Sequence, residues 1–451
     1  MEFKTFFKSL VEQFHLQGAS YAVMRNAEYL PDSTNGSDID FLFDKDDRSL
    51  ILEIFSQIAF VSDCRIIGFD NANDFCKFSI ACMNDHSVWA VCVDCNFGLN
   101  FKGIPYFTAE FKDISVFENG FFKLSREWEV IFSILKEVLH NGFIDEKIKM
   151  QAKEIHLNKI EKEIKEKFKD QPLLVRLLQD LDISITESIN RAFNKSHLLR
   201  NPVWYVFCKL RYINHRFLRV INPCGYVISF HGIDGVGKST VLSTLHPIFN
   251  VANHKNTEVI HLRPRLLPAL AEIKNKLSKT NDCLINPTQI VPMYSKPNSG
   301  YLLSYVRLMY LLMDYFFGYM VKYVIKLRKN NTVLLFDRYY DDVIVDPSRF
   351  RICLDQKKLR LFKYFIPKCN SKILLTIDPN IAWQRKRELS PEIAVSLQQR
   401  FIAEFSEFND IFTLDTTKLS EKEVSSRVLR YLTNSMDLHH RKRLKAVITN
   451  D

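Results

Sequence analysis

The chain has 451 residues, of which 47% are hydrophobic and 25% are charged, a composition typical of a globular protein of two or three domains and not of a disordered one. Lys and Arg number 62 against 52 Asp and Glu, and the resulting net charge of +10 suits an anionic ligand such as a phosphate. The 10 cysteines, with an N-terminus that lacks a basic-then-apolar signal pattern, predict a cytoplasmic protein with reduced thiols.

Residues 1–151 alternate between short strand-like and helix-like segments, which predicts an α+β domain. Residues 36–43 read Gly-Ser-Asp-Ile-Asp-Phe-Leu-Phe, a short strand with aspartates at alternate positions. Because side chains alternate along a strand, Asp38 and Asp40 share one face. Two neighbouring carboxylates repel each other unless a cation lies between them, so this pattern favours a divalent metal.

A third acid follows on a later strand. Residues 88–94 are apolar and end at Asp94, and they are expected to form a hairpin with residues 78–83. The hairpin would bring Asp94 toward the two earlier aspartates and give a site for two-metal phosphoryl chemistry. The alternative is that all three are ordinary acids at strand ends. Cys92 and Cys95 flank this acid on opposite faces of the strand, so zinc is not expected.

This Gly-Ser-Asp-x-Asp strand with a third acid on a later strand resembles the nucleotidyltransferase superfamily of the polymerase β type, over residues 21–139. The resemblance implies Mg²⁺ bound by Asp38, Asp40 and Asp94. Members of the family usually carry Gly-Gly or Gly-Ser upstream of the first acid to cradle a triphosphate. Here Val-Met-Arg-Asn stands in that place, and Arg25 could serve as a substitute.

Residues 152–222 are expected to form a helical connector, and their last part, 204–220, is aromatic and basic. One interpretation of this last part is an interfacial helix on an anionic membrane, which would make a peripheral membrane contact. The other, which we favour, is a connector helix that packs its aromatic side chains on a neighbouring domain. Residues 301–327 are also rich in apolar side chains, but Arg307, Asp314 and Lys322 interrupt them, which predicts a buried core helix.

A phosphate-binding motif opens the last region. Residues 232–240 read Gly-Ile-Asp-Gly-Val-Gly-Lys-Ser-Thr and fit G-x-x-x-x-G-K-[ST], between a strand at 226–230 and a helix that begins at Lys238. The glycines let the backbone direct N–H groups at nucleotide phosphates, while the lysine reaches the β- and γ-oxygens and the Ser239 hydroxyl ligates Mg²⁺. The residues expected to hold ATP and Mg²⁺ are Gly232, Asp234, Gly235, Gly237, Lys238, Ser239 and Thr240.

Strands and helices alternate through residues 223–451, which predicts an α/β domain with a parallel sheet and helices on both faces. The strand at 332–337 ends in Asp337, at the sheet edge where ligands of open α/β folds bind. Asp337 is expected to hold Mg²⁺ directly or through water, and Arg338 to grip a second phosphate.

These residues resemble thymidylate kinases and related nucleoside monophosphate kinases, over residues 225–431. The resemblance rests on the loop, on Asp-Arg-Tyr at 337–339 and on two arginines in the lid position. It implies that Asp234 faces the acceptor sugar and that Arg338 holds the acceptor phosphate. The residues expected to act in catalysis are Lys238, Asp337, Arg338, Arg385 and Arg387.

Two departures from the kinase pattern bear on the acceptor. His-Leu-Arg-Pro-Arg stands at 261–265 in place of the family's Arg-Glu-Pro-Gly-Gly, and an arginine expected before the Asp-Arg-Tyr triplet is replaced near Tyr315. Arg263, Arg307 and Asp314 are therefore the candidate acceptor contacts. The last two are seven positions apart on one helix and face the same way.

The sequence thus predicts an ATP-dependent kinase of a phosphorylated or hydroxyl acceptor other than thymidylate, with ATP and Mg²⁺, joined to a nucleotidyltransferase-like module. One alternative is a sugar or glycan-precursor acceptor. Another is a nucleotide-gated binding or scaffold protein whose N-terminal site is inactive. Nucleic acid is not expected as a partner. The protein is expected to form a homo-oligomer.

Overall fold

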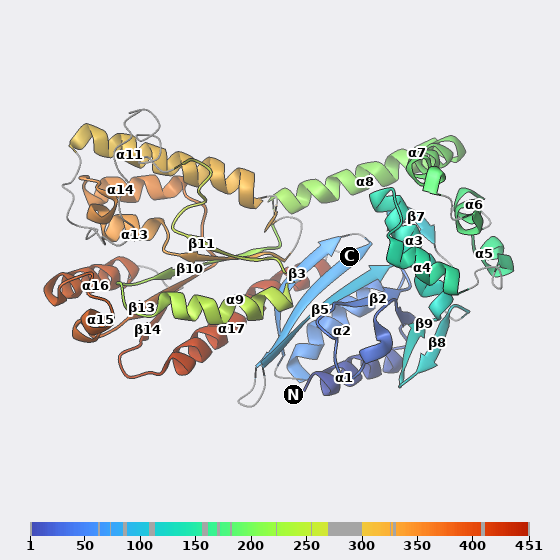
Figure 1. Cartoon of the computed structure of the whole chain (residues 1–451), viewed down its shortest axis with the longest axis horizontal. Helices are drawn as coiled ribbons and strands as arrows, with labels where there is room; N and C mark the ends of the chain where they lie inside the picture. Colours follow the sequence, from blue (N-terminus) through green and yellow to red (C-terminus); the bar gives the residue numbers. More distant parts are fainter. Residues whose placement is uncertain are drawn as a thin grey trace. The chain divides into compact units, whose positions relative to one another are not determined.

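The computed structural model of the chain describes residues 2–61, 64–72, 74–83, 88–107, 113–155, 161–168, 172–180, 183–221, 223–253, 255–268, 300–324, 326–327, 331–406 and 411–449. The chain forms two compact units, Met1–Ile221 with His439–Asp451 and Asn222–Leu438 (Figure 1). The helices expected to connect two domains are part of the first unit. Each unit has its own sheet.

The first unit contains a seven-stranded mixed sheet in the order β3-β4-β5-β2-β1-β9-β8. Strands β4 and β5 pair in antiparallel fashion, as the sequence predicts, and β2 runs parallel to β5 with Asp40 opposite Asp94. Strands β6 and β7 form a separate pair. The strands are β1 (Tyr21–Val23), β2 (Ile39–Phe43), β3 (Cys64–Ala72), β4 (Phe75–Met83), β5 (Val88–Phe97), β6 (Leu99–Phe101), β7 (Ile104–Phe107), β8 (Ser115–Glu118) and β9 (Phe121–Leu124).

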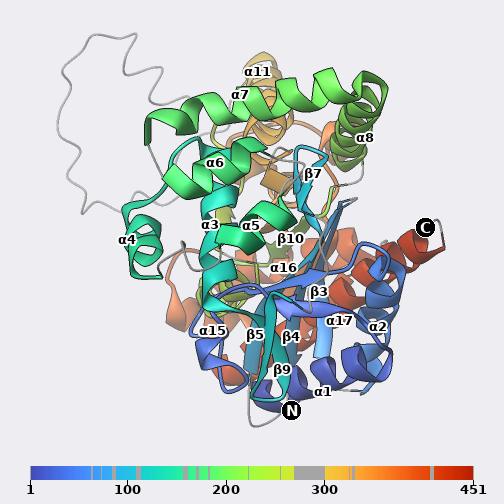
Figure 2. The same ribbon diagram turned by 90° about the vertical axis from the view of Figure 1, so that its right-hand side faces the viewer.

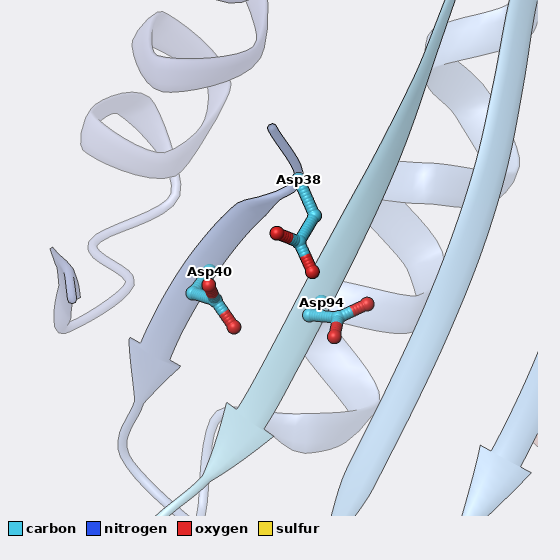
Figure 3. Close-up of side chains that lie close together, drawn as sticks. All are labelled: Asp38, Asp40 and Asp94. Atoms are coloured by element: carbon cyan, nitrogen blue, oxygen red, sulfur yellow. The ribbon is translucent and has the colours of Figure 1, made fainter. Parts of the chain in front are cut away.

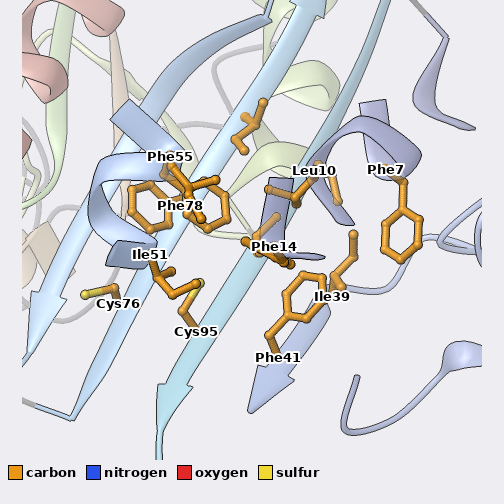
Figure 4. Packing of buried hydrophobic residues seen from close by; sticks show 14 of the residues in the cluster. Phe7, Leu10, Phe14, Ile39, Phe41, Ile51, Phe55, Cys76, Phe78 and Cys95 are labelled. Atoms are coloured by element: carbon orange, nitrogen blue, oxygen red, sulfur yellow. The ribbon is translucent and has the colours of Figure 1, made fainter. Parts of the chain in front are cut away.

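Alternation along β2 sends its side chains to two different cores, because successive residues of a strand point to opposite faces. Phe41 and Phe43 pack with α1 and α2 in an aromatic-rich cluster (Figure 4). Leu42 lies in a second cluster, with α3. Asp40 shares that second face. The helices described in this unit are α1 (Phe3–Leu16), α2 (Arg48–Val61), α3 (Arg126–Asn141), α4 (Glu146–Glu154), α5 (Glu161–Lys167), α6 (Pro172–Asp180), α7 (Ile183–Arg200) and α8 (Pro202–Ile221).

Helices α4 and α7 pack against α3, and α8 packs against α7 (Figure 2). These contacts make the helices after α3 an extension of the second core. Ile164, Leu177 and Phe193, from three successive helices, are all fully buried in it.

The second unit contains a five-stranded sheet in the order β11-β12-β10-β13-β14, and every neighbouring pair is parallel. This confirms the predicted parallel sheet. The chain starts at the central strand, β10, adds β11 and β12 on one side of it and then β13 and β14 on the other. Ligands of such sheets bind at the carboxyl ends of the strands where the strand order changes side. The strands are β10 (Tyr226–His231), β11 (Thr257–His261), β12 (Val333–Asp337), β13 (Ser371–Thr376) and β14 (Ile411–Asp415).

Helices flank this sheet, and their bounds follow from local signals such as Asp378 capping α15 and Asp355 capping α14. The helices described here are α9 (Lys238–Ala252), α11 (Tyr301–Met313), the π-helix η3 (Asp314–Val324), α13 (Tyr340–Val345), α14 (Gln356–Phe362), α15 (Pro379–Arg385), α16 (Pro391–Ser406) and α17 (Glu421–Ile448), whose end belongs to the first unit.

The apolar segment that begins at Tyr301 forms α11 and η3. One face is in the core, with Leu308, Tyr315 and Tyr319 buried, while the opposite face exposes large apolar side chains such as Leu302. The predicted core helix is therefore buried on one side. Of the helices in the described residues, none combines the length and the apolar character needed to cross a membrane.

Candidate active site

A cavity of about 790 Å³ lies in the second unit at the carboxyl ends of β10 and β12. The phosphate-binding loop forms one wall, and Asp337 and Arg338 form another. The cavity collects the loop and the end of β12 in one place, as the strand pattern predicts. Its remaining charged lining comes from His261, Arg265, Arg349, Arg385, Lys386 and Glu421.

The loop needs glycine because of its backbone geometry. Gly232 and Gly235 have φ angles of 132° and 84°, and a Cβ atom at Gly232 would lie 2.3 Å from the carbonyl oxygen of Leu375. The chain can therefore turn sharply between β10 and α9. Helix α9 begins at Lys238, so its N-terminal N–H groups face the cavity.

The Lys238 ammonium is buried within the phosphate-binding loop. It donates hydrogen bonds to the carbonyl oxygens of Gly232 and Ile233, at 2.8 and 2.9 Å. Burial, together with the nearby Arg338 guanidinium, lowers the pKa of Lys238 to about 7. An anionic ligand in the cavity would favour the charged form of this amine, which is the form that binds phosphate oxygens.

Asp234 holds two arginines at the cavity wall. Its carboxylate accepts hydrogen bonds from Arg338 and Arg349, both at 2.6 Å. Burial alone would raise the pKa of Asp234, but the Arg338 and Arg349 guanidiniums hold it well below its usual range. The pair of arginines is therefore fixed by a charge that stays ionised. Arg349 comes from a short 3₁₀ turn after α13, and no motif in the sequence indicates it.

A buried chain of hydrogen bonds supports Arg338 from behind. Arg338 donates to Asp342 at 2.8 Å, and Asp342 pairs with the ring of His231 at 2.6 Å. The other ring nitrogen of His231 lies 2.8 Å from the Ser229 hydroxyl. His231 and Asp342 are fully buried, and no sequence motif indicates either of them. The only sequence signal is that Asp342 follows Arg338 by four residues, one helical turn.

Asp337 fits the role of a metal ligand. Its side chain is 8% exposed and lines the cavity, and Oδ2 lies 3.1 Å from a ring nitrogen of His261. Within the described residues, Oδ1 is buried and has no hydrogen-bond partner. A buried carboxylate oxygen without a partner is costly, so a cation or its bound water at this point would stabilise it.

The candidate acceptor residues lie elsewhere. Asp314 is fully buried and accepts hydrogen bonds from the Arg263 guanidinium at 2.7 Å and from the N–H groups of Leu266 and Leu267 at 2.7 and 2.8 Å. It thereby holds the segment after β11 in place. Neither of these side chains lines the cavity, and neither does Arg307. Arg265 does line it, although no sequence motif indicates this residue.

The expected lid lies at the end of α15. Arg385 is the last residue of this helix and lines the cavity together with Lys386, whereas Arg387 is outside the lining. All three side chains are exposed. The structure therefore brings one of the two expected arginines to the cavity, accompanied by a lysine.

The three aspartates of the first unit form one cluster. Asp38, Asp40 and Asp94 each offer a carboxylate oxygen, and these oxygens lie within 4.8 Å of one another (Figure 3). Burial raises the pKa of Asp94 to about 7, an effect that Lys77 opposes and the other two aspartates reinforce. Carboxylates this close suit a divalent cation.

Two cations of the protein already lie against this cluster. Arg25 donates a hydrogen bond to Asp40, and its guanidinium lies 3.8 Å from Asp38. Lys77 lies 3.1 Å from Asp94. Arg25, which the sequence predicts as a possible triphosphate contact, thus contacts the aspartates themselves. A cavity of about 340 Å³ adjoins the site, lined by Arg25, Asp40 and one face of α3 that carries Glu129, Ser133, Lys136 and His140.

Cys92 and Cys95 lie on opposite faces of β5, as alternation predicts. The Cys92 thiol is 3.7 Å from Asp94, while Cys95 is buried in the aromatic-rich core.

No family model and no curated protein matches this chain. Among solved structures, a thymidylate kinase from Ehrlichia chaffeensis is similar, with 13% sequence identity and a TM-score of 0.31, over 46% of this chain and 98% of that one. This likeness is too weak to identify the fold, whose description rests on the strand order and the loop geometry given above.

Proposed function

We propose that the second unit is an ATP-dependent phosphotransferase of the nucleoside monophosphate kinase type, with a phosphorylated acceptor. The observation that carries this proposal is the convergence of a complete phosphate-binding loop, Asp337 and a set of arginines on one cavity. Six Lys and Arg side chains and three carboxylates line that cavity, a surplus of positive charge suited to phosphate groups.

Each wall of the cavity has a role in this reaction. The N–H groups of the loop and Lys238 bind the ATP phosphates, and Ser239 and Asp337 hold Mg²⁺. Mg²⁺, when bound, neutralises charge on the β- and γ-oxygens. The acceptor oxygen bonds to the γ-phosphorus as the bond to the β–γ bridging oxygen breaks and ADP leaves. Arg385 and Lys386, which line the cavity, would offset the charge on the transferred group.

Arg338 and Arg349 are the proposed contacts of the acceptor phosphate. They are held side by side by Asp234, and guanidinium groups fixed in this way bind phosphate through paired hydrogen bonds. A neutral acceptor would offer these two guanidiniums no charged oxygen besides those of Asp234 and Asp342. A phosphorylated acceptor therefore fits better than an uncharged hydroxyl compound.

The test is transfer of label from γ-labelled ATP, with Mg²⁺, to a panel of nucleoside monophosphates, sugar phosphates and uncharged hydroxyl compounds. We expect label on one phosphorylated class and little on thymidylate, because the Arg-Glu-Pro-Gly-Gly segment is replaced at 261–265. Efficient transfer to thymidylate would restore the simple family interpretation. Label released only to water, whatever the acceptor, would contradict the phosphotransferase proposal.

A second function is proposed for the first unit, on the strength of the three carboxylates and the adjoining cavity. A divalent cation at Asp38, Asp40 and Asp94 would suit nucleotidyl transfer, with the nucleotide in the cavity beside α3. Release of pyrophosphate from a nucleoside triphosphate in the Lys238→Ala protein would support it, since that variant lacks the kinase loop lysine. The competing possibility is an inactive site, in which Arg25 and Lys77 take the place of metal.

A further inference from the structure

Helix α8 is fixed to the first unit by one of its faces. Trp204, Tyr205 and Cys208 pack against the second core of that unit. Near the end of the helix, Arg219 forms an ion pair with the buried Asp70 at 2.5 Å. At Gly103, a Cβ atom would lie 2.9 Å from the helix backbone, so the contact is close. The direction in which the opposite face points is therefore set by contacts within the unit.

The opposite face of α8 is a stripe of exposed large apolar side chains. Its members are 49–79% exposed and recur at intervals of one, three or four residues, so they share one side of the helix. Exposed apolar residues are ordinary when scattered, but a continuous stripe marks an interaction surface. We call these residues the α8 stripe: Val203, Val206, Phe207, Leu210, Ile213, Phe217 and Leu218.

Cations border the stripe on both sides. At about 100° per residue, Arg211 lies along one edge and Lys209 and Arg216 along the other. Both arginines are exposed. The sequence contains no Asp or Glu between Glu187 and Asp234, so an acid that offsets these cations must come from another element, as Asp74 does for Arg211. Long basic side chains can extend toward charged groups while the stripe between them is covered.

We propose that the α8 stripe lies on the surface of an anionic lipid bilayer. An apolar face about 22 Å long, with cations along its edges, matches the boundary between acyl chains and anionic headgroups. A second copy of the chain fits less well, because a symmetric pairing would bring two cationic edges together without any acid of α8 between them. The interpretation favoured from sequence, a helix that packs its aromatic side chains on a neighbouring domain, describes Trp204 and Tyr205, and the proposal adds a lipid contact for the opposite face. The proposal is independent of the phosphotransferase proposed above.

The test is flotation of the full chain with vesicles of phosphatidylcholine alone or with about 30% phosphatidylserine. We expect flotation only with the anionic vesicles, and its loss as salt rises toward about 1 M. The double variant Phe207→Ser with Phe217→Ser should bind at least about tenfold more weakly. Phe143→Ser is the matched control, because Phe143 is 58% exposed elsewhere in the same unit, and it should bind like the wild type.

The charge component is tested separately with Arg211→Gln and Arg216→Gln. Each should weaken binding to the anionic vesicles about fivefold, as expected for one cation near such a surface. Circular dichroism and a melting curve check that each variant is folded.

Four outcomes would overturn the proposal. The first is that the wild type does not float with anionic vesicles, and the second is that Phe143→Ser weakens vesicle binding as much as the double variant does. The third is that the protein forms a dimer in solution and the double variant dissociates it. The fourth is flotation that survives the α8 variants but is lost with Leu302→Ser on α11, since the lipid contact would then belong to the exposed face of that helix.

Discussion

Six Lys and Arg side chains face three carboxylates around the cavity of the second unit, whereas three carboxylates face two cations at the acidic site of the first. The two sites therefore carry surplus charge of opposite sign. A surplus of charge of one sign attracts a ligand of the other sign. The cavity suits phosphate groups, and the acidic site suits a divalent cation.

The sites also differ in how their charges are held. In the cavity, an acid holds the cations in place, since Asp234 fixes Arg338 and Arg349 at its wall. At the acidic site the cations contact the acids that would hold a metal, since Arg25 binds Asp40. The first arrangement presents a binding surface, whereas the second must open before a metal ion can bind.

The largest expected effect is that of Lys238→Ala on phosphoryl transfer. The ammonium group is the only Lys side chain within the loop, and it lies in a buried setting where charge interactions are strong. We expect kcat to fall about 100-fold or more. The measurement is transfer of labelled phosphate, with ATP affinity measured by titration. Lys418→Ala, an exposed lysine outside the cavity lining, is the control. Unchanged turnover in a folded Lys238→Ala protein would remove the basis of the kinase assignment.

The next effect sharpens the choice of acceptor contacts. Arg349→Ala should raise the KM for the phosphorylated acceptor about 10- to 100-fold, because a charged hydrogen-bond donor is lost, and should change the KM for ATP little. Arg307→Ala is the matched control, because Arg307 does not line the cavity. If Arg307→Ala raises the acceptor KM and Arg349→Ala does not, the acceptor binds near α11, as the sequence predicts.

The sequence could predict those features that depend on residues close together in the chain. The phosphate-binding loop and Asp337 follow from apolar runs that end in recognisable residues, so their placement at one sheet edge was predictable. Asp38 and Asp40 share a face by alternation alone. The position of Asp94 beside these two aspartates could not be derived from a local pattern. It depends on the parallel register between β2 and β5, which no short pattern specifies.

The residues that were missed owe their positions to packing between distant segments. Arg349 reaches Asp234 across 115 positions of the chain, and His231 reaches Asp342 across 111. Spacing on a helix showed that Arg307 and Asp314 could share a face, but not which way that face points. In the structure Asp314 points into the protein, where it binds the segment after β11.

The acidic site is tested by Mn²⁺ binding, in an Asp337→Asn background that removes the metal ligand proposed for the kinase cavity. We expect Mn²⁺ to bind and to raise the melting temperature as its occupancy increases. Adding Asp40→Asn should weaken binding about tenfold or more, because a ligand and half of the alternating pair are lost. Asp46→Asn, an exposed acid nearby in sequence, should have no such effect. If Mn²⁺ neither binds nor stabilises the protein, the three aspartates are structural acids paired with Arg25 and Lys77.

The smallest expected effect is an increase in metal affinity on Arg25→Met. Arg25 competes with a metal ion for Asp40 and lies 3.8 Å from Asp38, so its removal leaves a more negative site. The pair is partly exposed, with 39% of the Arg25 side chain accessible, so the gain is screened and should be about fivefold. Methionine keeps most of the apolar stem, and Lys8→Met controls for loss of an exposed cation from the same unit. Without metal, the Arg25→Met protein should melt at a lower temperature than the wild type, because the three carboxylates then share only Lys77, and saturating Mn²⁺ should restore most of the difference. A fall in affinity would mean that Arg25 supports the bound ion, and the acidic site would then resemble the cavity of the second unit, where Asp234 and the arginines form one binding surface.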